Sequence, residues 1–287
     1  MTDGLNIVVC IKQVPDSAQI SVDPKTNTIM RQGAPTIINP YDLYALEAAL
    51  SLRDRTGGRV TVPTMGPAMA AEALRKALGH GADDAVLMSD RFFAGSDTLA
   101  TSFVLARAIA RIGQDRPVDM VFTGKQTIDG DTAQVGPGLA QRLGLNQLTY
   151  VAEIRDVDLD QRQITVQRRA EGGLQVLRTR LPALVSVLED THTLRRGSLP
   201  DVLRAQRAEI PTWDAAAVGI EDTQNCGLRG SATKVVKMFA PQAKSERATI
   251  LESEDGTAES QAAAVIAALD QADPELFDVA AHPPEQA

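Results

Sequence analysis

The segment from Gly124 to Val135 combines the residue types that bind a phosphate group. It reads GKQTIDGDTAQV and follows an apolar run that ends at Gly124. A helical pattern opens at about Thr132, and the free N–H groups and dipole of a helix start attract an anion. Lys125 adds a positive charge, and Thr132 adds a hydroxyl. The loop therefore predicts a phosphate site.

Two aspartates in this loop, Asp129 and Asp131, would repel a phosphate placed against them. We expect Asp131 to cap the helix that starts at Thr132, and Asp129 to accept hydrogen bonds from a ribose or from backbone N–H groups. The alternative is that Asp129 to Asp131 form only a capped surface turn. Because the sequence has neither a G-x-x-x-x-G-K-[ST] motif nor an acidic cage, we expect no metal site.

Other chemistries find little support. The first apolar run continues as CIKQVP (Cys10 to Pro15) rather than as a G-x-G-x-x-G fingerprint. No serine or cysteine stands beside a histidine in a nucleophile motif, which disfavours hydrolysis. The formal net charge of −8 argues against nucleic acid as a partner.

The elements around the loop have the pattern of an α/β protein. Apolar runs typical of strands covered on both faces occur at 6–11, 59–65, 85–90 and 118–124, and helical patterns lie between them at 41–55, 68–78 and 97–112. This order predicts a doubly wound, mostly parallel, Rossmann-like sheet. Ligands of such sheets bind at the carboxyl ends of the strands.

Three further segments complete the predicted organisation. An insertion at 19–30 is interpreted as two short strands. Strand patterns at 149–158, 163–168 and 174–180, closed by 184–188, predict a β-meander as a second layer. Helices are expected at about 199–207 and 259–271. We therefore divide the chain into a nucleotide-binding domain with its meander (1–190), a partner-recognition and interface segment (191–240), and a C-terminal arm with a solvated tail (241–287).

The two cysteines, Cys10 and Cys226, support neither a disulfide framework nor a zinc site. The N-terminal apolar run is too short for a signal peptide and lacks a basic leader, and no segment reaches the roughly 20 apolar residues of a membrane span. We expect a cytoplasmic protein without direct membrane insertion.

Several motifs in order resemble the beta (small) subunit of electron-transfer flavoproteins. They are VVCIKQV (8–14), INPYD (38–42), MGP (65–67), LGHGAD (78–83) and GKQTIDGDTAQVGP (124–137), with LPDVLRAQR at 199–207. The resemblance implies a heterodimer with an alpha subunit that holds a redox-active FAD. It also implies that this chain binds a second adenine nucleotide at the strand-end loop.

The resemblance also implies a set of cofactor-binding residues. Cys10 and Met65 lie at strand ends; the rival interpretation of Cys10 is an ordinary core residue, and that of Met65 is a side chain that only lines the adenine. The remaining positions are Asn39, Pro40, Tyr41, Asp42, Gly124, Lys125, Gln126, Thr127, Ile128, Asp129, Gly130, Asp131, Thr132, Ala133, Gln134 and Val135.

The identity of the nucleotide depends on two segments. DGDTAQVGP (129–137) is similar to the electron-bifurcating group of the family, in which small residues leave room for a second phosphate and hence for FAD. GLRGSAT (227–233) resembles another segment of that group, with Ala232 in place of a proline, and adds Ser231 and Thr233 to the binding set. We expect FAD; AMP, as in single-flavin carriers, is the alternative.

For the bifurcating group, the resemblance implies that NADH reduces the FAD of this subunit. Electrons then pass to the alpha-subunit FAD and to ferredoxin or flavodoxin. A dehydrogenase or quinone oxidoreductase is the expected further partner, and Thr191 and Arg195 are its candidate contacts. THTLRR (191–196) keeps only that arginine of the family's usual N-E-P-R-Y loop, so a variable surface loop is the alternative. A stand-alone ATP-binding module of the stress-protein kind is a further alternative function.

Overall fold

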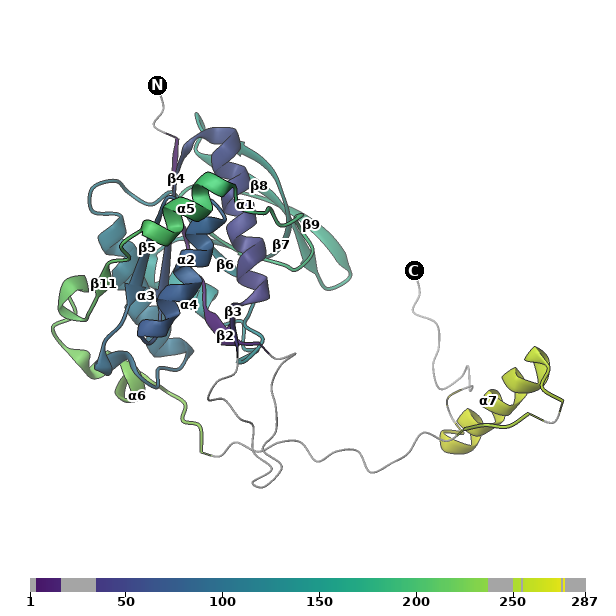
Figure 1. The fold of residues 1–287 in the computed structure, drawn as a ribbon. Helices are drawn as coiled ribbons and strands as arrows, with labels where there is room; N and C mark the ends of the chain where they lie inside the picture. The colour runs from purple at the N-terminus through teal and green to yellow at the C-terminus, as the bar shows by residue number, and fades with distance from the viewer. Residues whose placement is uncertain (1–3, 17–34, 237–249, 254, 275, 277–287) are drawn as a thin grey trace. The chain divides into compact units, whose positions relative to one another are not determined.

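The computed structural model describes residues 4–16, 35–236, 250–253, 255–274 and 276 of the 287-residue chain. They belong to two compact units, residues 1–239 and residues 240–287, each treated by itself. The strands and most helices lie in the first unit (Figure 1). The predicted strands at 19–30 lie outside the described residues. The finer division of the chain at residue 190 stays a prediction.

One nine-stranded sheet forms the centre of the first unit. Neighbouring strands are parallel from the first edge of the sheet as far as β7 (Asn146–Asp158). Two strands, β8 (Gln163–Ala170) and β9 (Gly173–Arg180), then continue the sheet in antiparallel pairing. The predicted α/β class with a mostly parallel sheet is confirmed. In spatial order the strands are β11 (Thr212–Trp213), β5 (Asp84–Met88), β4 (Gly58–Met65), β1 (Leu5–Val9), β6 (Met120–Gly124), β10 (Ala183–Val187), β7 (Asn146–Asp158), β8 (Gln163–Ala170) and β9 (Gly173–Arg180).

The position of β10 corrects the predicted meander. β10 does not close the meander but lies between β6 and β7, parallel to both, and the meander strands extend the same sheet instead of forming a second layer. All five residues of β10 are buried. A continuous apolar run of this kind needs cover on both faces, which the centre of a parallel sheet provides.

Helices cover both faces of the sheet. Leu5, Ile7 and Val9 of β1 face the core under α1 (Pro40–Thr56) and α2 (Ala71–Gly79). Val8 faces the core under α3 (Thr98–Ile112) and α4 (Val135–Leu143). This alternation along β1 is the doubly wound arrangement. Because β4 and β5 extend the sheet to one side of β1 while β6 lies on the other, the strand order reverses between β1 and β6. Ligands of open α/β sheets bind at such a switch point.

Short elements complete the first unit. β2 (Gln13–Pro15) and β3 (Thr36–Ile38) pair in an antiparallel ladder. Helix α5 (Leu199–Arg207), which packs against α2, has the predicted bounds. β11 was not expected, because two residues are too few for a periodic signal. Single turns of 3₁₀ helix are η2 (Ala68–Ala70), η3 (Arg91–Phe93), η4 (Ala216–Val218) and η5 (Thr223–Asn225), and α6 (Gly227–Gly230) is one helical turn.

Helix α7 (Ala258–Ala272) is the one element among the described residues of the second unit, and it confirms the helix expected at 259–271. It has no buried residue, and Val265, Ile266 and Leu269 are exposed. In the part of the chain that the structure describes, no helix has the length and apolar character needed to cross a bilayer.

Candidate functional site

The candidate site is the loop between β6 and α4, and its shape differs from the prediction in one respect. α4 begins at Val135, not at Thr132, and Gln134 is its N-cap residue without a side-chain cap. Asp131 and Ala133 have left-handed backbones, with φ of 56° and 55°. Two such residues cannot belong to a right-handed helix, so α4 cannot begin at Thr132, and with Gln134 in the N-cap position Asp131 does not cap α4. Its carboxylate accepts a hydrogen bond from the Gln126 side-chain amide instead.

Two buried side chains at the start of α1 hold the backbone of this loop. Asn39 Nδ2 donates to the Gln126 carbonyl at 2.8 Å, and Asn39 Oδ1 accepts from the Ile128 N–H at 3.2 Å. Asp42 accepts from the Gly124 N–H at 3.1 Å and from the Lys12 N–H at 2.8 Å. Pro40 occupies the first turn of α1, where its missing N–H costs nothing. The predicted residues Asn39 and Asp42 therefore fix the shape of the loop through their side chains.

Gly124 is required by this close packing. A Cβ atom at residue 124 would lie 2.5 Å from Asp42 Oδ1 and 2.7 Å from the backbone carbon of Tyr41. A similar approach brings Gly136, in the first turn of α4, against the end of β6: a Cβ there would lie 2.9 Å from Thr123 Oγ1. The buried Thr123 hydroxyl has no hydrogen-bond partner among the described residues.

Burial raises the pKa of two side chains beneath the loop, Asp42 and Cys10. Burial raises the pKa of Asp42 to about 7, although hydrogen bonds from the Lys12 N–H, Asn39 and the Gly124 N–H oppose the rise. Burial and, to a lesser extent, the charge of Asp42 raise the pKa of the Cys10 thiol. Cys10 packs in the core under α3 and α4, and its N–H donates to the Phe122 carbonyl at 3.0 Å. Its thiol therefore has the character of a core side chain.

Two lysines bring positive charge to the loop. Lys12 Nζ, from the segment after β1, lies 2.8 Å from both carboxylate oxygens of Asp129. Burial raises the pKa of Asp129, but the hydrogen bond and charge of Lys12 outweigh it and lower that pKa overall. Lys125 Nζ lies 5.5 Å from the ring centroid of Tyr41 and 5.9 Å from that of Tyr150, within cation–π range. Lys12 and Tyr150 were not predicted, since neither belongs to the motif that follows β6.

The GLRGSAT segment lies at the start of α3, next to this loop. Asp97, the N-cap residue of α3, accepts hydrogen bonds from the Thr233 N–H at 2.9 Å and from its hydroxyl at 3.1 Å. The Asp97 N–H donates to the Ser231 hydroxyl at 2.8 Å. One residue further on, the Thr98 hydroxyl donates to Gln134 Oε1 at 2.9 Å. The structure thus brings two predicted segments together where the N-termini of α3 and α4 meet.

The other predicted site residues are distributed along the same edge. Met65 is the last residue of β4 and packs, half-buried, on the core under α3 and α4. Thr127 is half-buried in the loop, and Gly130, Thr132 and Gln134 are exposed on it. Val135 opens α4. All of them therefore lie near the carboxyl ends of the strands.

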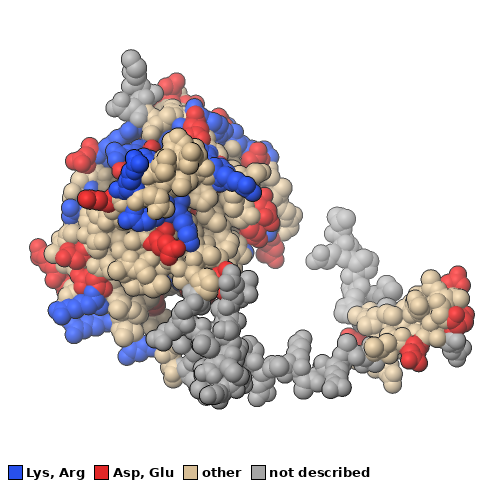
Figure 2. All heavy atoms as spheres, viewed as in Figure 1, with Lys and Arg blue, Asp and Glu red and all other residues tan. Residues whose placement is uncertain are grey.

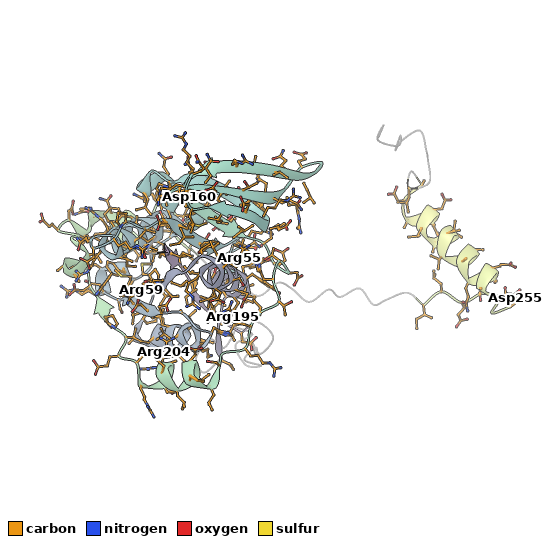
Figure 3. All side chains as sticks on the ribbon, turned by 90° about the horizontal axis from the view of Figure 1, so that it is seen from above. Arg55, Arg59, Asp160, Arg195, Arg204 and Asp255 are labelled. Atoms are coloured by element: carbon orange, nitrogen blue, oxygen red, sulfur yellow. The ribbon has the colours of Figure 1, made fainter. Side chains whose placement is uncertain are left out.

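The predicted partner-binding residues lie elsewhere, beside α1. Arg195, labelled in Figure 3, pairs with the buried Glu47 at 2.9 Å and with Asp54 at 2.8 Å. Both carboxylates belong to α1. Burial raises the pKa of Glu47, but the hydrogen bonds and charge of Arg195 outweigh it and lower that pKa overall. The Thr191 hydroxyl donates to the Leu188 carbonyl at 3.1 Å. These contacts fasten the segment to the protein, and its role toward a partner stays a prediction.

Two hollows lie away from the candidate loop. One of about 550 Å³ is lined by Arg59, Asp84 and Trp213 among others, and one of about 790 Å³ surrounds His80, Arg195 and Arg204. Their walls contain ion pairs such as Arg59 with Asp84 and Arg204 with Asp201. Basic and acidic side chains are interspersed on the face that Figure 2 shows. No group of three or more His, Cys, Asp or Glu residues suited to a metal ion occurs within the described ranges. The strand-end loop is therefore the better candidate.

Comparison with known proteins identifies the family of the chain. Residues 26–218 match the family model described as the electron transfer flavoprotein domain. The chain is 62% identical to Protein FixA of Azorhizobium caulinodans over 275 residues, which cover 96% of this chain and 97% of the relative. It is 45% identical to the electron transfer flavoprotein subunit beta of Megasphaera elsdenii over 245 residues, covering 84% and 89% of the two chains. The chain therefore belongs to the electron transfer flavoprotein family, as a beta subunit.

Proposed function

We propose that this beta subunit binds an adenine nucleotide whose phosphates lie at the loop from Gly124 to Val135. The observation that carries the proposal is the anchoring of this loop by Asn39 and Asp42. Both are buried polar side chains, and their hydrogen bonds hold the loop backbone in one shape at the switch point of the sheet. A polar group is costly to bury. The burial of Asn39 and Asp42 to hold this backbone therefore supports a loop that is preorganised for binding.

The residues at the loop fit an anionic group. Gly124 and Gly136 let the loop and the start of α4 pack directly against α1 and β6, and the Thr123 hydroxyl at the end of β6 lacks a partner among the described residues. The N-termini of α3 and α4 meet at the Thr98–Gln134 hydrogen bond, so two helix dipoles favour negative charge there. Lys125, held over two tyrosine rings, adds a cation.

We further propose that the nucleotide is FAD, with the loop holding its phosphates. Ser231 and Thr233, fastened to Asp97, extend the polar edge beyond α4 and support a ligand longer than AMP. A bound flavin supplies one- and two-electron redox chemistry. The residues of this chain would hold and orient it, and exclude water from the end of β6.

In this proposal the subunit pairs with an electron transfer flavoprotein alpha subunit that carries its own FAD. NADH is the proposed electron donor, and ferredoxin or flavodoxin and a dehydrogenase or quinone oxidoreductase are the proposed acceptors. We also propose a cytoplasmic location. The described cysteines, Cys10 and Cys226, are both free and buried, as expected in a reducing compartment.

The test is a nucleotide count on the heterodimer. The chain is co-expressed with its alpha subunit, the purified complex is denatured, and released FAD and AMP are quantified by chromatography. Two FAD and no AMP per heterodimer are expected, whereas one FAD and one AMP would make the chain the AMP-binding subunit of a single-flavin carrier. Release of ATP, or of no nucleotide beyond the alpha-subunit FAD, would contradict the proposal.

A matched pair of variants ties the count to the loop. Asn39→Ala removes the side chain that holds Gln126 and Ile128 and is expected to lower the content of the second nucleotide several-fold. Asn146→Ala, which removes one exposed hydrogen bond to the Arg180 carbonyl, is the control and should keep the wild-type content. Equal losses in both variants would argue against the loop as the site.

A further inference from the structure

Negative charge surrounds the proposed phosphate position. Asp129 and Asp131 are in the loop, Asp97 caps α3 beside it, and Asp42 lies beneath it. A phosphate brings further negative charge, so the affinity of the loop for an anion depends on how each carboxylate is compensated.

The four carboxylates differ in their partners. Asp97 accepts hydrogen bonds from the Ala100 and Thr233 N–H groups, Asp42 accepts two backbone N–H groups, and Asp131 accepts from a neutral amide. Asp129 alone among them forms an ion pair in the described structure, and its partner is Lys12. Lys125 forms no ion pair within the described residues, so its charge stays available to a ligand.

Backbone hydrogen bonds hold Lys12 in a position from which its ammonium group can neutralise the Asp129 carboxylate. Its N–H donates to Asp42 at 2.8 Å, and its carbonyl accepts from the Asn39 N–H at 2.8 Å. The start of α1 that shapes the loop therefore also fixes the backbone of Lys12. The side chain then reaches across from the end of β1, and its Nζ lies 2.8 Å from both oxygens of Asp129.

We infer that Lys12 is a positioning residue of the nucleotide site whose ammonium neutralises Asp129 and so allows the loop to accept a phosphate. The inference rests on the proposed function. Lys12 acts through Asp129 and does not touch the nucleotide. Its removal therefore weakens binding only while Asp129 is negative.

The test measures AMP affinity by calorimetry on the heterodimer after nucleotide removal, at low ionic strength. Lys12→Met leaves Asp129 uncompensated and is expected to weaken AMP binding about tenfold or more, since charges several Å apart interact strongly at an effective dielectric of about 20. Asp129→Asn alone should bind AMP at least as tightly as wild type. The double variant Lys12→Met/Asp129→Asn should return to within about threefold of wild type, because the charge that Lys12 balances is gone.

Lys76→Met is the matched control. Lys76 is 45% exposed in an ion pair with Glu72 on α2, compared with 46% for Lys12, and its replacement should leave AMP affinity unchanged. Thermal melting of each variant checks that the fold is retained. About 0.5 M salt should reduce the defect of Lys12→Met, because the uncompensated Asp129 carboxylate is partly exposed and salt screens its repulsion of the phosphate.

Three results would overturn the inference. An unchanged affinity of Lys12→Met would remove its role, and a loss that Asp129→Asn does not rescue would show that Lys12 contacts the nucleotide directly. Weaker binding by Asp129→Asn alone would show that the ligand uses this carboxylate. If the wild-type subunit binds neither AMP nor FAD, the proposed function itself fails. That result is distinct from a failure of the inference, in which the wild type binds the nucleotide and only the behaviour of the variants differs from expectation.

Discussion

At the residue scale, Asp42 joins the loop after β6 to the end of β1. Its carboxylate receives the N–H groups of Gly124 and Lys12, and Gly124 has no room for a side chain against it. The carboxylate therefore accepts hydrogen bonds from two backbone N–H groups that have no partner in the pairing of the strands. Its full burial costs solvation of the charged form, which is why its pKa rises to about 7.

The raised pKa of Asp42 predicts a pH-dependent stability. The folded pKa of about 7 exceeds the ordinary value of 3.8, so between these values the native state binds the proton and the unfolded state does not. The contribution of Asp42 to the free energy of unfolding thus falls by on the order of 4 kcal/mol as the pH rises from about 4 to about 7. Above about pH 7 this contribution is constant.

Urea unfolding of wild type and Asp42→Asn from pH 4.5 to pH 8.5 tests this. Asparagine does not titrate, and the other groups titrate alike in both proteins. The free energy of unfolding of wild type relative to the variant should decline up to about pH 7 and then level off. A difference that is constant over this range would show that Asp42 is ionised throughout.

At the element scale, α1 organises two regions of the molecule. Its first turn holds the nucleotide loop through Asn39 and Asp42. Two and four turns further on, Glu47 and Asp54 hold Arg195 of the segment between β10 and α5. This segment carries the two predicted partner contacts, so its conformation depends on α1 as well as on its own sequence.

Arg195→Ala is expected to release that segment. It leaves the buried Glu47 carboxylate without its cation, which should destabilise the protein by about 1–3 kcal/mol after allowance for the partial exposure of the arginine. Amide hydrogen exchange should accelerate across 190–198 and stay unchanged in α3. The control is Arg169→Ala, whose half-exposed pair with Glu189 spans 3.9 Å and should be worth less than about 0.5 kcal/mol. Unaltered exchange at 190–198 in Arg195→Ala would refute the anchoring role.

At the scale of the whole molecule, the hydrophobic core belongs to the first unit. The buried apolar residues of the described structure all lie between Leu5 and Cys226. Helix α7 of the second unit has no buried residue and spans 15 residues, a length at which an isolated helix is marginal in water. The two units therefore contribute very differently to stability.

Deletion of residues 240–287 should accordingly leave the first unit folded. We expect a melting temperature within about 2 °C of the full chain, since no core residue is removed. The comparison is made by circular dichroism on the two purified chains without the alpha subunit. A much lower melting temperature of the truncated chain would show that the second unit stabilises the first.

The sequence by itself determined the α/β class, the loop after β6 and the family. These are local signals: buried strand patterns alternate with helical ones, and motifs such as INPYD and GKQTIDGDT keep their order. Helix α5 was bounded correctly from the same kind of signal. Local patterns suffice here because the period of apolar residues sets both the element and the faces that it buries.

The tertiary structure decided the features that depend on distant residues. β10 pairs with β6 on one side and with β7 on the other, inside the sheet. Its apolar pattern predicts a buried strand but does not specify which strands lie beside it. The start of α4 follows from left-handed backbones at Asp131 and Ala133 in a loop held by α1. Lys12 and Asp129 are 117 residues apart in the chain, and only the folding of β1 beside β6 brings their charges together.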